Sequence, residues 1–99
     1  DVDGLRFYRT PPATGFLARR GEEITALHVA AEARDAGVGS ALMAAAKAAS
    51  PILRLWVFQA NTPALRFYAR QGFVETEHGD GSGNEEGLPD LALNWTRHD

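Results

Sequence analysis

The segment from Val29 to Leu42 has the composition of an anion-binding turn. A strand-like apolar run ends at Val29, a polar stretch with Gly37 and Gly39 follows, and an alanine-rich helical pattern begins at Ser40. The first N–H groups of a helix have no intrahelical acceptor and carry the positive end of the helix dipole. Because glycine has no Cβ, an anion can approach that backbone closely. The segment therefore predicts a phosphate cradle, the alternative being that the glycines only shape the turn.

Two common phosphate-binding motifs are excluded by the residues themselves. A nucleoside triphosphatase loop requires Gly-Lys followed by Ser or Thr, and the chain has no such sequence. The dinucleotide fingerprint requires a third glycine three residues after the second, and Leu42 stands there. A phosphate bound at this turn would therefore be held by another class of cradle.

Hydrophobic periodicity predicts the strands and helices that position this turn. Six strands are predicted from apolar and aromatic runs between turn residues, over residues 5–8, 15–18, 24–29, 53–58, 73–77 and 91–95. Apolar residues at helical spacing predict a helix over 40–50, ended by Pro51. A second helix is predicted over 64–71, with Asn61 as its N-cap and Gly72 just after its end. The order β-β-β-α-β-α-β-β predicts a mixed α/β (α+β) fold with a mostly antiparallel central sheet and two helices.

Two segments allow more local predictions. The strand over 53–58 has apolar residues on both faces, which predicts a central strand covered on both sides. The segment 78–89 contains four glycines, which predicts a long, mobile loop. Oxygen-bearing side chains alternate in that loop, but the spacing is not that of a calcium loop.

Length and composition place the chain among ordinary globular proteins. Its 99 residues predict a single domain over 1–99. The absence of cysteine excludes disulfides, Cys-ligated zinc and thiol catalysis, and the three histidines lack metal-ligand spacing. A net charge of −3 argues against a nucleic-acid partner. No apolar run is long enough for a membrane span and no secretion signal is visible, so the expected location is the cytoplasm.

Two blocks of the sequence resemble one known family. Leu27-x-Val29, followed by Arg34-x-x-Gly37-x-Gly39 and a helix, resembles the acetyl-CoA-binding motif of the GCN5-related N-acetyltransferase (GNAT) family. The family's Asn…Phe-Tyr…Gly-Phe helix is similar to a second block, Asn61-x-x-Ala64-x-x-Phe67-Tyr68-x-x-x-Gly72-Phe73. The separation of the blocks also matches. The resemblance implies an acyl-CoA N-acyltransferase-like fold, acetyl-CoA (coenzyme A) as the acetyl donor, and no metal.

The resemblance also implies how acetyl-CoA is held. In the family the cofactor lies in a V-shaped opening between two splayed strands, which correspond to 24–29 and 53–58 here. The N–H of Val29 would bond the thioester carbonyl and stabilise the negative charge that develops there. Asn61 would contact the pantetheine arm, although it is equally well explained as a helix cap. The pyrophosphate would be held by backbone N–H groups of Arg34, Asp35, Ala36, Gly37, Val38, Gly39 and Ser40.

Two proton transfers complete the chemistry that the resemblance implies. Tyr68 matches the tyrosine that protonates the departing thiolate; a phenol titrates near ~10 and a thiol near ~8.5, so the phenol can donate at neutral pH. The alternative for Tyr68 is a core residue beside Phe67. An acceptor ammonium, with a pKa near ~10.4, must lose a proton before it attacks. Glu23, six residues before Val29, matches the family's carboxylate, acting directly or through water, although it also fits a plain exposed turn. His28 is a second candidate.

The implied protein is an enzyme, a GNAT-type N-acetyltransferase that moves an acetyl group to a primary amine by direct attack in a ternary complex. The acceptor would be a small-molecule or peptide amine, without a nucleic-acid or membrane partner; a homodimer is an option. The family's N-terminal strand and two helices have no counterpart in residues 1–4, so the resemblance implies an N-terminally short form of the fold. Three explanations are open: the chain is a truncated piece, a naturally minimal member of the family, or a subunit that relies on a partner. The alternative function is therefore a non-catalytic or truncated CoA-binding module that needs a partner subunit or a missing N-terminal segment.

Overall fold

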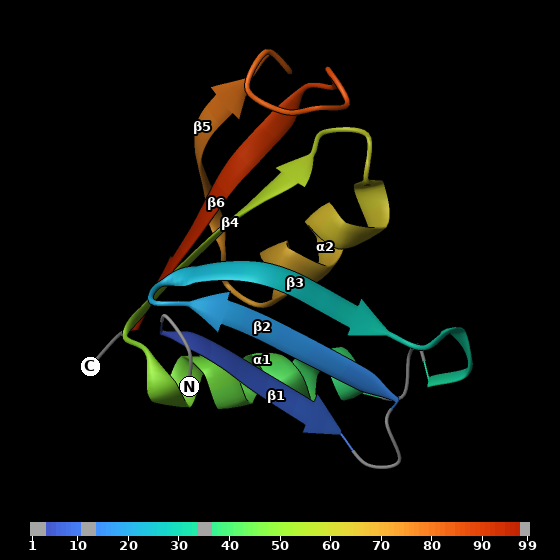
Figure 1. Cartoon of the computed structure of the whole chain (residues 1–99), viewed down its shortest axis with the longest axis vertical. Helices are drawn as coiled ribbons and strands as arrows, with labels where there is room; N and C mark the ends of the chain where they lie inside the picture. Colours follow the sequence, from blue (N-terminus) through green and yellow to red (C-terminus); the bar gives the residue numbers. More distant parts are fainter. Residues whose placement is uncertain (1–3, 11–13, 34–36, 98–99) are drawn as a thin grey trace. The chain divides into compact units, whose positions relative to one another are not determined.

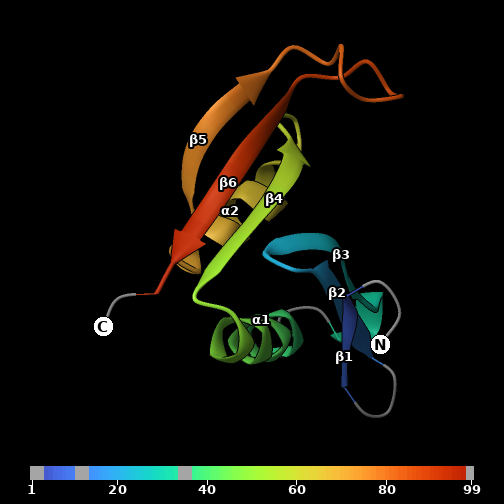
Figure 2. The same cartoon turned by 60° about the vertical axis from the view of Figure 1, so that its left-hand side comes forward.

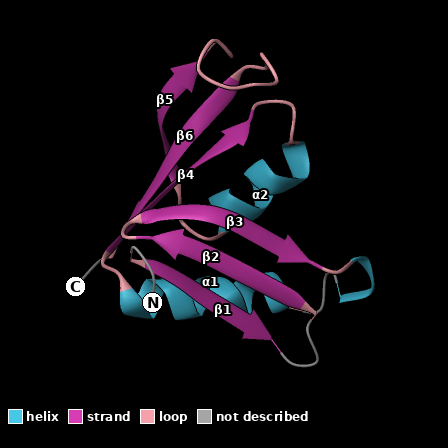
Figure 3. Ribbon diagram, viewed as in Figure 1, coloured by secondary structure: helices cyan, strands magenta, loops and turns pink. Residues whose placement is uncertain are grey.

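Six β-strands and two α-helices follow one another, within the part of the chain that the structure describes, in the predicted order (Figures 1 and 3). The structure is a computed structural model that describes residues 4–10, 14–33 and 37–97. The elements are β1 (Leu5–Thr10), β2 (Gly15–Arg20), β3 (Glu23–Val29), a 3₁₀ turn (Ala31–Ala33), α1 (Val38–Ala49), β4 (Ile52–Phe58), α2 (Thr62–Arg70), β5 (Val74–Gly79) and β6 (Asp90–Thr96). The predicted mixed fold with mostly antiparallel strands and two helices is therefore confirmed.

The chain forms two compact units, Asp1–Leu53 and Arg54–Asp99. In the first unit the strands are ordered β1-β2-β3, and β1 and β3 each pair antiparallel with β2. In the second unit the order is β4-β6-β5, and β5 pairs antiparallel with β6. The prediction of one domain over the whole chain stays a prediction.

The turn between β2 and β3 is shorter than predicted. The predicted strand ends at residue 18, but Arg19 is the fifth residue of β2, and the turn is made at Gly21 with φ 59°. Arg19 holds this turn: its Nη1 donates to the carbonyl of Gly21 at 2.7 Å, and its Nε donates to the hydroxyl of Tyr8 at 2.9 Å. The side chain therefore joins the turn to the neighbouring strand β1.

A β-bulge at Thr25 sets which side chains of β3 share a face with β2. Before the bulge Arg19 lies opposite Ile24, and after it Ala18 lies opposite Ala26. The extra residue, Thr25, has no residue opposite it in the register of β2, so every later side chain of β3 is moved to the other face. As a result Phe16 lies opposite His28.

Helix α1 covers one face of β1–β3, as Figure 2 shows. Leu42, Met43 and Ala46 are the buried residues of α1, and Leu17 of β2 is fully buried. Gly15 permits this close packing: a Cβ at that position would lie 2.8 Å from Cγ1 of Val38 and 2.9 Å from the carbonyl oxygen of His28. The first turn of α1 is therefore fixed against the end of the β2–β3 hairpin.

The second unit places α2 against one side of its sheet (Figures 1 and 2). The aromatic rings of Tyr68 and Phe73 meet edge to face at 5.5 Å. The helix ends at Arg70, and Gly72, predicted to lie just after the helix, follows with φ 91°. The N–H of Gly72 donates to Ala69 and that of Phe73 to Tyr68, both at 3.0 Å, which is a Schellman motif.

Two predictions for the second unit are corrected. Strand β4 is not covered on both faces: Leu55 and Val57 are buried, whereas Trp56, which points the other way, is 49% exposed. The loop predicted over 78–89 is shorter, because β5 extends to Gly79. Asn84 organises the loop, since its Oδ1 accepts from the N–H of Leu88 at 3.2 Å and its Nδ2 donates to the carbonyl of Leu88 at 2.9 Å.

None of the helices in the described ranges is both long and apolar enough to cross a bilayer.

Replacement of Gly15 by Ala tests the packing of α1 on the hairpin. The added methyl would overlap Val38 and the backbone of His28, so we expect the free energy of unfolding to fall by about 1–3 kcal/mol. Urea denaturation followed by far-UV circular dichroism measures the change. Gly83→Ala is the matched control, because a Cβ there would meet nothing within 4 Å. Equal stability of the two variants would show that α1 does not pack on Gly15.

Candidate functional site

The turn before α1 has the features of the predicted phosphate cradle. Gly37 is the N-cap of α1 in a left-handed conformation, with φ 82° and ψ 6°, and makes no side-chain cap. A Cβ at Gly37 would meet nothing within 4 Å, so the space beside this backbone is open. Among the described residues, the first turn of α1 contains no acidic side chain that would compete with an anion for the positive end of the helix. Of the residues predicted to hold the pyrophosphate, Gly37, Val38, Gly39 and Ser40 lie at this helix start, whereas Arg34, Asp35 and Ala36 lie outside the described residues.

Val29 is the last residue of β3 and is half-buried. The next N–H along the chain, that of Ala30, donates to the carbonyl of Thr14 at 2.7 Å, toward the β2 side. Because successive N–H groups of a strand point to opposite edges, the N–H of Val29 points to the edge of β3 away from β2. The N–H of Val29 is therefore not used in pairing with β2, and its role as a donor to a thioester carbonyl stays a prediction.

Tyr68 lies on α2 and is only 9% exposed. Its ring contacts Phe67 at 5.3 Å and Phe73 at 5.5 Å, both edge to face. Burial raises the pKa of the Tyr68 phenol above its ordinary value. The hydroxyl therefore keeps its proton at neutral pH and is available as a proton donor.

Asn61 caps α2, as predicted. Its side-chain Oδ1 accepts from the N–H of Ala64 at 3.3 Å, and Pro63 stands in the first turn of the helix. The cap uses the carbonyl oxygen of the side chain and not the amide nitrogen. The predicted role of Asn61 as a helix cap is therefore confirmed. Its contact to the pantetheine arm stays a prediction, for which the amide nitrogen of the side chain would serve.

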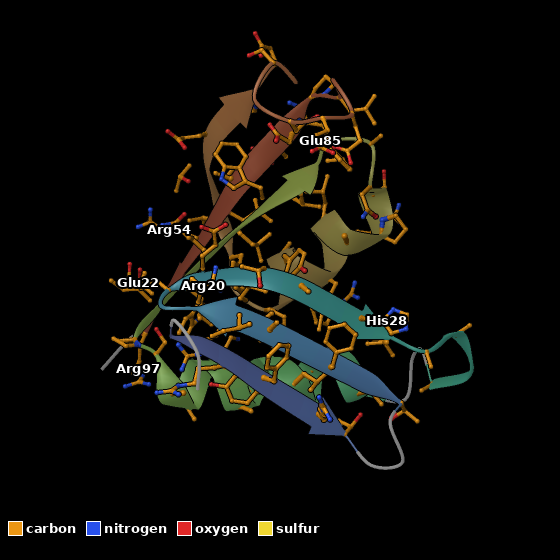
Figure 4. All side chains as sticks on the ribbon, viewed as in Figure 1. Arg20, Glu22, His28, Arg54, Glu85 and Arg97 are labelled. Atoms are coloured by element: carbon orange, nitrogen blue, oxygen red, sulfur yellow. The ribbon has the colours of Figure 1, made fainter. Side chains whose placement is uncertain are left out.

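The two candidate bases lie at opposite ends of β3. Glu23 is the first residue of the strand, exposed and opposite Arg20. At about 3.3 Å per residue, the six steps from Glu23 to Val29 span about 20 Å. His28 is the neighbour of Val29, and Figure 4 shows it at the arrowhead end of β3, with Arg20 at the far end of the hairpin. The imidazole of His28 is exposed and lies 5.8 Å from the ring of Phe16.

Comparison with known proteins decides the family. Residues 5–75 match a family profile described as an acetyltransferase (GNAT) domain. The chain belongs to the GNAT acetyltransferase family. The matched residues include both sequence blocks that carry the resemblance, from Leu27 to Phe73. The family inferred from the sequence is therefore confirmed.

Individual GNAT relatives agree with this assignment. The chain is 37% identical over 84 residues to the peptidyl-lysine N-acetyltransferase YiaC of Escherichia coli K12, covering 82% of this chain and 55% of that protein. The apo form of YjaB from Escherichia coli has a TM-score of 0.76 and 29% identity, covering 84% of this chain and 56% of that one. A Bacillus anthracis putative streptothricin acetyltransferase in complex with acetyl coenzyme A has the same fold, with a TM-score of 0.77, 23% identity and coverages of 86% and 56%. This chain spans about half the length of these relatives.

Two residues of this GNAT chain that shape the site are missed by sequence reasoning. Gly15 admits the first turn of α1 to the end of the sheet, and Phe16 contacts the candidate base His28. The sequence contains only a weak signal for the role of Gly15, namely a glycine at the start of a strand after a Pro-rich break. No local signal identifies Phe16, because its pairing with His28 depends on the bulge at Thr25.

Stability at alkaline pH tests the environment of Tyr68. The folded chain disfavours the phenolate, so the stabilisation is fully present below the ordinary phenol pKa near ~10 and is lost as pH rises through the higher folded-state value. We expect the free energy of unfolding of the native chain to fall above pH ~10 and that of Tyr68→Phe to fall less. Denaturant titration across this range measures both. Tyr8→Phe is the matched control; a curve for Tyr68→Phe as steep as that of Tyr8→Phe would contradict the burial effect.

Proposed function

We propose that this chain performs acetyl-CoA-dependent transfer of an acetyl group to a primary amine, by direct attack within a ternary complex. The match of residues 5–75 to the GNAT domain carries this proposal. Its local support is the glycine-capped start of α1, where the space beside Gly37 is open and the described first turn of the helix has no acidic residue. The bound cofactor would supply the acetyl group as an activated thioester.

Each residue has a defined task in this proposal. Backbone N–H groups of 34–40 hold the pyrophosphate, and the amide of Asn61 contacts the pantetheine arm. The N–H of Val29 donates to the thioester carbonyl, where it stabilises the charge that forms on attack. Tyr68 gives its proton to the departing thiolate. Glu23 and His28 are the two candidates for removing the proton of the acceptor ammonium.

The acceptor we propose is a lysine side chain in a peptide. The relative that shares 37% identity with this chain is named as a peptidyl-lysine N-acetyltransferase, which supports this class. A small-molecule amine is the alternative acceptor. The homodimer and the cytoplasmic location expected from the sequence stay predictions.

A second function is favoured by one observation. The chain spans about half the length of its GNAT relatives, which is compatible with a CoA-binding module that turns over only with a partner subunit or a further segment. Release of free CoA by the 99-residue chain, with acetyl-CoA and a panel of amines, decides between the two. Turnover rejects the module, and binding without turnover rejects the enzyme.

Two substitutions test the assigned tasks. Gly37→Asp places a carboxylate at the cradle, so we expect acetyl-CoA affinity by calorimetry to fall at least tenfold, a loss of about 1.4 kcal/mol. Gly37→Asn is the matched control, because it has the same shape without the charge and Asn tolerates the left-handed conformation. Tyr68→Phe should lower kcat by about 100-fold and leave acetyl-CoA affinity unchanged. Equal affinity of the Asp and Asn variants, or full turnover by Tyr68→Phe, would refute the corresponding task.

A further inference from the structure

The bulge at Thr25 places His28 on the same face of the first unit as the aromatic side chains Phe7 and Phe16. Phe7, Phe16, Ala18, Ala26 and His28 point away from α1 and form what we call the Phe16 face. Phe7 is 55% exposed and Phe16 37% exposed. One row of this face runs from Arg9 on β1 through Phe16 on β2 to His28 on β3. The row lies at the end of the hairpin at which β3 finishes with Val29.

A base for the acceptor ammonium must lie within hydrogen-bond distance of it, or one water away. The amine attacks the thioester carbon, whose oxygen the N–H of Val29 would hold. His28 is bonded to Val29, with their Cα atoms about 3.8 Å apart. Glu23 lies about 20 Å away along the strand, which is beyond the reach of a single water.

From this placement we propose that His28 is the proton acceptor for the amine substrate and that Phe16 is its positioning residue. The assignment rests on the proposed acetyl transfer and gives the proton-removal task to His28 in place of Glu23. The ring of Phe16 lies 5.8 Å from the imidazole at an interplanar angle of 35°, so it restricts the rotation of an otherwise exposed side chain. His28, unlike Glu23, therefore lies in the part of β3 from which a general base could reach the amine.

The proton balance of the step is complete. The ammonium gives one proton to the neutral imidazole of His28, and the freed lone pair forms the N–C bond as the C–S bond breaks. The sulfur keeps the electron pair of that bond and takes a proton from Tyr68. The nitrogen loses a second proton, which restores Tyr68 through solvent. Of the two protons lost by nitrogen, one ends on the CoA thiol and one leaves His28 for solvent.

The charged side chains that share a face with His28 lie at a distance from it. On the Phe16 face, among the described residues of the first unit, the charged side chains are Arg9, Arg20 and Glu23. Arg9 lies two strands away, about 10 Å, and at that distance its charge is largely screened at physiological salt. Arg20 and Glu23 lie at the far end of the hairpin. Helix α1, with Lys47, packs on the opposite face of the strands.

The test measures kcat/KM for a lysine peptide across pH about 5 to 9, the range in which histidine titrates. The variants are His28→Ala, His28→Gln, Phe16→Leu and Glu23→Gln, with His78→Gln as the matched control on an exposed strand of the second unit. Calorimetric affinity for acetyl-CoA shows that each variant is folded. We expect both His28 variants to lose about 100-fold or more in kcat with unchanged acetyl-CoA affinity. The fall in activity at acid pH should disappear with the imidazole, and free imidazole should restore turnover to His28→Ala.

The remaining variants separate positioning from proton transfer. Phe16→Leu should lower kcat by less than the His28 variants and keep the acid limb of the pH profile, because the imidazole is still present. Glu23→Gln should lose less activity than the His28 variants and keep the acid limb, and His78→Gln should behave like the native chain. Turnover of His28→Ala at the native rate, persistence of its acid limb, or a loss confined to Glu23→Gln would overturn the assignment. Acetyl-CoA binding with no turnover by the native chain would instead reject the proposed acetyl transfer, and with it this step.

Discussion

The register between β2 and β3 is the constraint on which the first unit depends. With a two-residue turn after Arg20 and no irregularity, Phe16 would lie opposite Leu27, and its face would be built from different side chains. The extra residue at Thr25 moves the pairing by one, so Leu27 lies opposite the fully buried Leu17, and His28 lies opposite Phe16. One unpaired residue therefore decides both which apolar side chains of β3 face α1 and which side chain of β3 lies opposite Phe16.

Two glycines shape the first unit because they lack a side chain. Gly15 and Gly37 contribute no side chain, and each leaves space that another group uses. At Gly15 that space is filled by Val38, Leu42 and the backbone of His28, so it fixes the start of α1. At Gly37 the space is empty and the backbone is left-handed, so it leaves the first turn of the helix accessible to an anion.

Much of the fold could be predicted because its signals are local. Asn61 as an N-cap, Gly72 as the residue after α2 and Pro51 as the end of α1 each act through backbone groups within a few residues of themselves. The predictions that failed depend on distant neighbours. Whether Trp56 is covered depends on what packs against β4, and the order of the loop after β5 depends on Asn84 meeting Leu88. The pairing of Phe16 with His28 could not be predicted for the same reason. Periodicity places residues on a face of a strand, but it does not reveal a bulge in the partner strand.

The position of the tryptophans makes the two units contribute differently to the fluorescence of the chain. The sequence has two tryptophans, Trp56 and Trp95, and both lie in the unit Arg54–Asp99. Tryptophan fluorescence therefore reports on the second unit, whereas the hairpin and α1 contribute to the far-UV circular dichroism without any tryptophan of their own. Trp56 is half exposed, and Trp95 is less so, beside Gly72 at the end of α2. A soluble quencher thus distinguishes the open face of β4 from the packed end of α2, and comparison of the two optical signals shows whether the two units unfold as one.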